Sequence, residues 1–266
     1  MHGDDIPVRI QWKKSALGYN LGMRTAQLFI TCLVDTFFPE VGEATVAVLR
    51  AAGVEVEFPP GQTCCGQPMF NAGLRDEARR VAEHTIQVFE TTSGDVVLPS
   101  GSCAHMIRHN YADLFADDPE LRRRAGALAS RTFELTEYLV DVLGIDDFNA
   151  RWDGAIAYHP TCHLHRGLGV DRQPRQLLSN IRGAEVRELP EGQDCCGFGG
   201  VFSVEHPEIA AEMLKRKMAN LEATQAQTLI VCDAGCLLHI QGGLHRASRG
   251  QRVRHIAEVL ANGQHG

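Results

Sequence analysis

Short apolar runs and longer amphipathic stretches alternate along most of the chain. In the first half, strand-like runs fall at residues 26–31, 54–58 and 96–98, and helix-like stretches at residues 41–52, 74–90 and 104–114. The second half repeats this order, with strand-like runs at residues 155–158, 185–189 and 228–231 and helix-like stretches at residues 175–181, 209–223 and 237–245. Alternating strands and helices favour parallel sheets with right-handed crossovers. We therefore predict an α/β fold of two pseudo-symmetric, Rossmann-like parallel-sheet halves.

Two further segments are interpreted from the same pattern. Residues 121–143 are expected to form a helix that connects the halves, because apolar residues recur there at near-helical spacing: Leu128, Leu135, Leu139 and Val142. The basic run at residues 215–217 is interpreted as a solvated helix face.

The nine cysteines reveal an internal repeat. Four pairs are each separated by 130 to 133 residues: Cys32 and Cys162, Cys64 and Cys195, Cys65 and Cys196, and Cys103 and Cys236. Both adjacent pairs stand in a Gly-Gln-x-Cys-Cys-Gly sequence. The chain therefore contains two related halves, expected over residues 24–145 and 152–262. Cys232 has no counterpart, and its simplest interpretation is a small buried core residue.

Each repeated cysteine lies in a loop that follows a predicted strand. Ligands of open parallel sheets bind outside the carboxyl ends of the strands, so the cysteine loops of each half are expected to converge there. Four thiolates are typical ligands of a zinc ion or of an iron–sulfur cluster. Structural zinc sites usually take ligands in short C-x₂₋₄-C pairs, whereas adjacent cysteines can reach different metal atoms of a cluster. The spacing favours an iron–sulfur cluster, with zinc as the alternative.

Neighbouring residues can support such a centre. His159 and His163, which flank the first cysteine of the second half, can serve as ligands, proton carriers or donors to cluster sulfurs, and Arg166 can offset thiolate charge. The alternative is that these three are loop residues whose hydrogen bonds the backbone satisfies. Gly66 and Gly197, which follow the two cysteine pairs, allow close approach of the backbone to the site.

Composition excludes several classes of protein. The 266 residues include 26 Lys and Arg against 33 Asp and Glu, a formal net charge of −7, which is not the basic balance of a general nucleic-acid binder. No uncharged apolar run reaches the roughly 18 residues of a transmembrane helix, and residues 1–26 lack the apolar segment of a secretory signal. We therefore expect a cytoplasmic protein whose cysteines are reduced thiols.

The double pattern of Cys, Cys-Cys-Gly and a terminal Cys resembles the cysteine-rich CCG domain found in heterodisulfide reductase and in the iron–sulfur subunit of glycolate oxidase. The second half is most similar to the lactate-utilisation protein A family, at residues 158–163, 166–169, 195–200 and 235–243. The resemblance covers residues 24–261 and leaves residues 1–23 as an expected disordered leader. The chain departs from the heterodisulfide reductase pattern, which ends in C-x-x-C, because Ser100 and Asp233 occupy the first of these two cysteine positions.

This resemblance implies an iron–sulfur electron-transfer subunit of an oxidoreductase complex that converts L-lactate to pyruvate. It implies a [4Fe–4S]-type cluster in one or both halves, with the eight repeated cysteines as ligands, and two partners, a larger iron–sulfur protein and a third subunit. The departure at Ser100 and Asp233 leaves the type of cluster open. Three alternatives are a zinc-binding scaffold subunit, a glycolate oxidase-type subunit, and a thiol–disulfide oxidoreductase whose cysteine pairs react directly with substrate.

Overall fold

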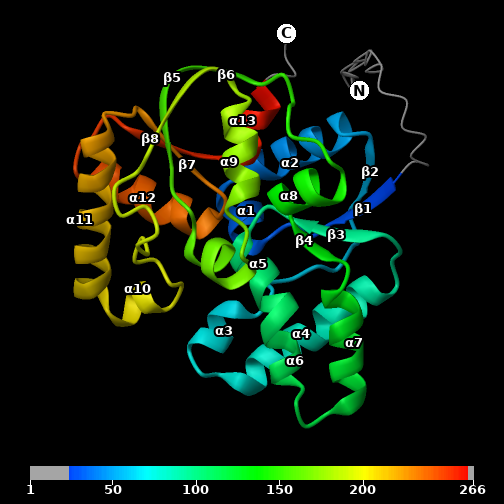
Figure 1. The fold of residues 1–266 in the computed structure, drawn as a ribbon. Helices are drawn as coiled ribbons and strands as arrows, with labels where there is room; N and C mark the ends of the chain where they lie inside the picture. Colours follow the sequence, from blue (N-terminus) through cyan, green and yellow to red (C-terminus); the bar gives the residue numbers. More distant parts are fainter. Residues whose placement is uncertain (1–23, 263–266) are drawn as a thin grey trace, which may run out of the picture.

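Two four-stranded, all-parallel sheets form the framework of the protein (Figure 1). The computed structural model describes residues 24–262, so the leader expected at residues 1–23 lies outside the described residues. The first sheet has the order β2-β1-β3-β4 and consists of β1 (Arg24–Leu28), β2 (Val54–Glu57), β3 (Asp95–Leu98) and β4 (Thr132–Glu134). The second has the order β6-β5-β7-β8 and consists of β5 (Arg151–Tyr158), β6 (Arg182–Arg187), β7 (Thr228–Val231) and β8 (Arg252–His255). The predicted α/β architecture is confirmed.

Helices connect successive strands in both halves. The first half contains α1 (Cys32–Phe37), α2 (Pro39–Ala51), α3 (Gln67–Asn71), α4 (Arg75–Glu90), α5 (Gly101–His105), α6 (Tyr111–Leu114), α7 (Pro119–Ala129), α8 (Leu135–Glu137) and the π-helical turns η1 (Met106–Asn110) and η2 (Tyr138–Val142). The second contains η3 (His163–Gly167), α9 (Arg172–Ser179), α10 (Phe202–Glu205), α11 (Pro207–Thr224), α12 (Ala234–Arg246) and α13 (Ile256–Ala261). The long helices α2 and α11 both begin with proline, whose fixed φ and missing N–H suit the first helical position.

The strand order places the cysteine loops at a topological switch point. In each sheet the chain moves outward from the first strand to the second and then crosses back to the third, which opens a crevice at the carboxyl ends of β1 and β3, and of β5 and β7. Cys32 and Cys103 follow β1 and β3, and Cys162 and Cys236 follow β5 and β7. The predicted position of the cysteines at the carboxyl ends of the strands is confirmed. The prediction that all of them lie in loops is wrong for Cys32, Cys103 and Cys236, which lie in the first turns of α1, α5 and α12.

The prediction of a single helix over residues 121–143 is wrong. Helix α7 ends at Ala129, and β4 then adds a fourth strand to the sheet, pairing Thr132 with Val96 of β3. The leucines with helical spacing lie on different elements. Leu128 of α7 packs in one apolar cluster, and Leu135 of α8, which follows β4, packs in another. The helical spacing of these leucines therefore reflects two elements that bury their apolar faces in different clusters, and not one continuous helix. The corresponding fourth strand of the second half, β8, was also not predicted.

The halves share an apolar core. One buried cluster combines Leu49 of α2 and Val97 of β3 with Ile156 of β5, Ile230 of β7 and Leu260 of α13. Helix α13, at the end of the described chain, packs against α2 of the first half (Figure 1). This common core fixes the orientation of the two sheets relative to each other.

Gly101, at the start of α5, allows close contact between the halves. A Cβ atom at this position would lie 2.6 Å from Cβ of Leu164 in η3. We expect Gly101→Ala to lower the free energy of unfolding by about 1–3 kcal/mol, because overpacking displaces the facing segments. Gly126→Ala in α7 is the matched control, since its new methyl group would meet nothing within 4 Å, and it should be neutral or stabilise by up to about 1 kcal/mol. Equal denaturation curves for the two variants would contradict this prediction.

A buried carboxyl group at the end of β4 should make stability depend on pH. Glu134 is fully buried, and its side chain accepts hydrogen bonds from the N–H groups of Thr136 and Glu137. Burial raises the pKa of Glu134 from 4.5 to about 8. The native protein therefore keeps a proton that the unfolded chain loses above pH 4.5. This contribution to the free energy of unfolding is fully present below pH 4.5 and is lost as the pH rises to about 8. The free energy of unfolding falls by up to about 1.4 kcal/mol per pH unit in this range.

Glu134→Gln tests this linkage, because glutamine keeps the acceptor oxygen and does not titrate. Denaturant unfolding at pH 5, 6, 7 and 8 should show a smaller loss of stability with rising pH in the variant than in the wild-type protein. Parallel pH profiles for the two proteins would show that Glu134 does not retain its proton in the native state.

Candidate metal centre

One cavity collects all eight repeated cysteines. The cavity has a volume of about 140 Å³, counted as the space that the centre of a water molecule can reach. Its walls include Cys32, Cys64, Cys65 and Cys103 from the first half and Cys162, Cys195, Cys196 and Cys236 from the second. The sequence indicated a converging set of four thiols in each half. The structure brings the two sets together, because the carboxyl ends of both sheets open onto the same space.

In the first half, two cysteines are half-buried and two are buried. Cys32 Sγ lies 3.7 Å from Cys64 Sγ, and both side chains are partly exposed. Cys65 and Cys103 are buried deeper, and the hydroxyl of Tyr111 donates a hydrogen bond of 2.9 Å to the carbonyl oxygen of Cys65. A buried tyrosine of the first half thus holds its Cys-Cys loop in place.

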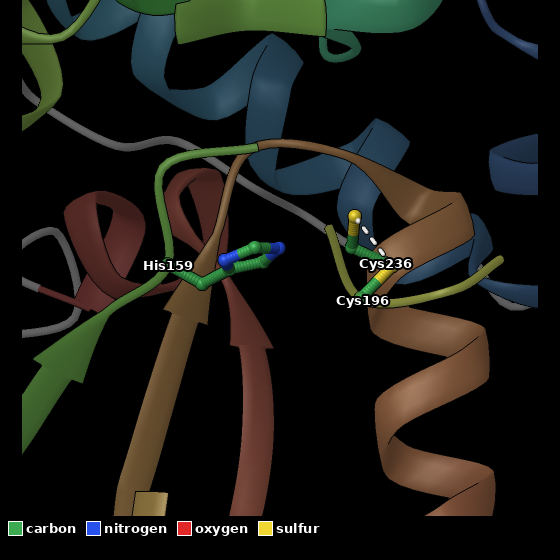
Figure 2. A group of neighbouring side chains, drawn as sticks. All are labelled: His159, Cys196 and Cys236. Carbon is green, nitrogen blue, oxygen red and sulfur yellow. Dashed lines mark hydrogen bonds between the residues drawn. The ribbon is translucent and has the colours of Figure 1, made fainter. Parts of the chain in front are cut away.

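The second half repeats this division. Cys162 and Cys195 are half-buried, whereas Cys196 and Cys236 are buried with their sulfurs 3.3 Å apart. A ring nitrogen of His159 and the sulfurs of Cys196 and Cys236 all lie within 4.8 Å of one another, and Figure 2 shows the imidazole directed toward the sulfurs. The second half therefore offers a nitrogen donor beside its four thiols.

One thiol of each Cys-Cys pair favours the thiolate form. A hydrogen bond from Cys32, followed by one from Cys65, lowers the pKa of Cys64 to about 3. Hydrogen bonds from Cys162 and then Cys196 lower the pKa of Cys195 to about 2. Since the thiolate is the form that binds metal, each half presents one ligand that is already deprotonated at neutral pH.

The glycines after the two cysteine pairs turn the backbone toward the sulfurs. The N–H groups of Gly66 and Gly197 each donate a hydrogen bond of 3.4 Å, to Cys64 Sγ and Cys195 Sγ respectively. Their φ angles of 87° and 94° lie in the left-handed region that favours glycine. At Gly197 a Cβ atom would lie only 2.7 Å from the carbonyl oxygen of Ala210. The glycines thus both permit the turn and supply N–H donors to sulfur.

The three polar residues predicted to support the centre of the second half, His159, His163 and Arg166, lie at different depths below the protein surface. His163 lines the cavity, with Nδ1 3.7 Å from Cys162 Sγ and Nε2 3.4 Å from Nε2 of Gln67 in the other half. His159 is fully buried behind the cysteines and is not among the residues that line the cavity. Arg166 is exposed and is not among the residues that line the cavity.

A buried cation lies near the second set of cysteines. Lys217 is 1% exposed, and its ammonium group donates hydrogen bonds of 3.0 Å to the carbonyl oxygens of both Glu191 and Gly192, just before the Cys-Cys pair. The interpretation of residues 215–217 as a solvated face is therefore wrong for Lys217. Its side chain lies on the buried side of α11, which the charge run alone could not indicate.

The two positions that depart from the C-x-x-C pattern contact each other. The carboxylate of Asp233 accepts hydrogen bonds of 3.0 Å from both the hydroxyl of Ser100 and the N–H of Ser102, and one of 2.9 Å from the N–H of Gly235. Ser100 and Asp233 belong to different halves and both line the cavity. Where a fifth thiol would stand in each half, this chain has a hydrogen-bonded bridge between the halves. The sequence marked both positions but contained no signal that they meet.

Cys232 lies outside the cavity lining. It is fully buried in the shared core, and its sulfur lies 3.9 Å from the hydroxyl of Tyr158. Its environment agrees with its interpretation as a small core residue.

The donor set fits a soft metal or a cluster. Thiolates and imidazole are the ligands preferred by zinc and by iron–sulfur centres. The buried hydroxyls of Thr31 and Thr161, which line the cavity just before the first cysteine of each half, have no hydrogen-bond partner among residues 24–262. Neither does Nε2 of His159, which belongs to the ring beside the sulfurs of Cys196 and Cys236. Thiols that gather around a cavity with unpartnered polar atoms are arranged for an occupant that supplies the missing contacts.

The fold and the paired cysteine loops define a duplicated cysteine-rich α/β protein. The family model of the cysteine-rich CCG domain matches the chain twice, over residues 26–108 and 156–241. Among solved structures, a hypothetical protein from Helicobacter pylori has a similar fold, with a TM-score of 0.62 and 10% identity over 91% of this chain. This chain spans only 49% of that protein.

Relatives of much higher sequence identity place the chain in a narrower family within this class of cysteine-rich proteins. Lactate utilization protein A 2 of Bacillus cereus (strain 03BB102) is 47% identical over 89% of this chain and 97% of the relative. Lactate utilization protein A of Exiguobacterium sp. is 45% identical over 91% of this chain and 98% of the relative. The chain belongs to the lactate utilization protein A family.

Proposed function

We propose that the protein is an iron–sulfur electron-transfer subunit that acts in lactate utilisation. The observation that carries this proposal is the single cavity lined by eight cysteines, four from each half. In this proposal residues 24–145 and 152–262 form two cysteine-rich units, and each unit holds one [4Fe–4S]-type cluster. Two clusters in a shared cavity can exchange electrons over a short distance, which is the arrangement that a relay needs.

The side chains and backbone of the protein hold the clusters and adjust their charge. The cysteines supply the ligands, and the N–H groups of Gly66 and Gly197 donate hydrogen bonds to sulfur that stabilise negative charge there. The apolar surroundings of the buried cysteines limit access of water. When bound, such clusters accept and release single electrons at a potential set by ligands, hydrogen bonds and burial.

The substrate is inferred from the relatives, whose names refer to lactate utilization. Conversion of L-lactate to pyruvate releases two electrons and two protons. We propose that a partner protein carries out this oxidation and that the present chain passes on the electrons one at a time. Its partners would be a larger iron–sulfur protein and a third subunit in the cytoplasm. Among the described residues, no helix combines the length and apolar character needed to cross a bilayer.

Metal analysis of the anaerobically purified protein tests the cofactor. We expect about eight iron atoms per chain with matching acid-labile sulfide, since each [4Fe–4S] cluster contains four, and a broad visible absorption band that dithionite bleaches. One zinc ion or more per chain without colour would overturn electron transfer, because zinc has no redox chemistry, and would favour a scaffold subunit.

Growth of a strain that lacks the gene tests the substrate. The deletion should abolish growth on L-lactate as sole carbon source and leave growth on glycolate unchanged. Complementation with the wild-type gene should restore growth on lactate, whereas a gene that carries Cys195→Ser and Cys196→Ser should not. Loss of growth on glycolate alone would assign the chain to a glycolate oxidase-type system.

A further inference from the structure

The two halves present different side chains at one equivalent backbone position beside the cysteines. Phe29 is the first residue after β1, and its N–H donates a hydrogen bond of 3.0 Å to the carbonyl oxygen of Val97 in β3. His159 is the first residue after β5, and its N–H donates one of 2.9 Å to the carbonyl oxygen of Ile230 in β7. The fold thus places a hydrocarbon ring in the first half where it places an imidazole in the second.

These two rings have different surroundings. Phe29 packs edge to face against Phe89, with 5.3 Å between ring centroids, in an apolar cluster that includes Cys65 and Cys103. His159 lies close to the buried sulfurs of its own half, as Figure 2 shows. The first half therefore surrounds its buried thiols with apolar groups, whereas the second adds a group that can bind metal.

Hydrogen bonding fixes which nitrogen of His159 is free. Nδ1 lies 3.0 Å from the carbonyl oxygen of Gly192. Because a carbonyl oxygen only accepts, Nδ1 carries the hydrogen, and Nε2 of the neutral ring keeps its lone pair. Nε2 is buried without a hydrogen-bond partner among the described residues. Metal-binding histidines commonly show this arrangement, in which the other ring nitrogen donates to a backbone carbonyl.

Lys217 reinforces the neutral state of this ring. Its ammonium group donates to the same carbonyl oxygen of Gly192 that accepts from His159. The shared oxygen brings this positive charge close to the ring, which favours the neutral imidazole, the form that binds metal.

We propose that Nε2 of His159 is a metal ligand in the second half, so that the two metal centres of this chain are chemically unequal. The proposal rests on the iron–sulfur function proposed above. The centre of the first half is held by four thiolates, whereas in the second the imidazole takes the place of one thiolate, so that only three of the four cysteines there are ligands. Replacing thiolate by neutral imidazole raises the reduction potential of iron–sulfur centres. The second centre is then the one that is reduced first.

Pulsed electron paramagnetic resonance of the dithionite-reduced full-length protein tests this ligand. We expect a strong nitrogen hyperfine coupling that changes when histidine is labelled with ¹⁵N. The coupling should disappear in His159→Cys, where a thiolate can replace the imidazole and retain the iron, and the higher of the two reduction potentials should fall. His163→Gln is the matched control for the nitrogen coupling, because this histidine also borders the cavity, and the coupling should persist.

The outcomes separate this proposal from the proposed function. Absence of iron and sulfide in the wild-type protein would overturn both. Iron and sulfide without histidine coupling in the wild-type protein would overturn only the role of His159, and this result needs no variant. A coupling that survives in His159→Cys, or one that is lost in His163→Gln, would likewise assign the nitrogen to another histidine.

Discussion

Replacing Cys195 and Cys196 together with serine is expected to remove about four iron atoms per chain, with the matching sulfide, and to leave the other cluster in place. These residues supply the thiolate of lowest pKa in the second half and one of its buried thiols. Serine has nearly the same shape but is a poor ligand for iron. The paired variant Cys64→Ser and Cys65→Ser should have the same effect in the first half, and all four substitutions together should leave the protein without iron.

Cys232→Ser is the matched control for this experiment. It makes the same chemical change at a cysteine that lies outside the cavity lining, so iron and sulfide content should stay at the wild-type level. Iron and sulfide analysis, with the visible spectrum, provides the measurement. A full complement of iron in the Cys195→Ser, Cys196→Ser protein would contradict the assignment of ligands. Loss of all iron from either paired variant would show that one centre draws on both halves.

Asp233→Ala is expected to lower the free energy of unfolding by about 3 kcal/mol or more, because it leaves buried donors without an acceptor. Ser100, Ser102 and Gly235 all donate to this carboxylate, and the two serines belong to the other half. The substitution therefore removes both the cap of α12 and a bridge between the halves at the cavity. Anaerobic denaturant unfolding of the metal-free and metal-loaded proteins measures the loss.

Two further variants separate the bridge from the cap. Asp118 caps α7 in the same way, accepting from the N–H groups of Glu120 and Leu121, but makes no contact between the halves in the described structure. Asp118→Ala should therefore cost about 1 kcal/mol, the usual effect of losing an N-cap. Asp233→Asn keeps one acceptor oxygen and should have an intermediate effect. Equal losses for Asp118→Ala and Asp233→Ala would show that the bridge between the halves adds no stability.

The position of the cysteines could be predicted because it depends on local order along the chain. Each of the eight repeated cysteines lies in the segment that follows a strand-like run, and parallel strands joined by helices place their carboxyl ends on one edge of the sheet. The strand predicted at residues 228–231 matches β7 at both ends, since three consecutive apolar residues, Leu229 to Val231, mark it clearly and all four of its residues are buried. The repeat of 130 to 133 residues then carried the same assignment into both halves.

Features that join distant segments could not be predicted in this way. β4 and β8 are short, and each is defined by pairing with a strand that is far away in the sequence. Lys217 stands in a run of positive charges, and only the packing of α11 shows that its side chain is buried. Hydrophobic periodicity reports which face of an element is apolar, but it does not report which other element covers that face.

The sequence by itself therefore determined the fold class, the duplication, and the eight cysteines that follow the strands, because these depend on residue type and local spacing. Only the tertiary structure decided that the two sets of cysteines share one cavity, that Asp233 bridges to Ser100, and that His159 faces the sulfurs of Cys196 and Cys236. The physical reason is the common apolar core. It orients the two sheets through contacts between residues far apart in the chain, and no local pattern encodes that orientation.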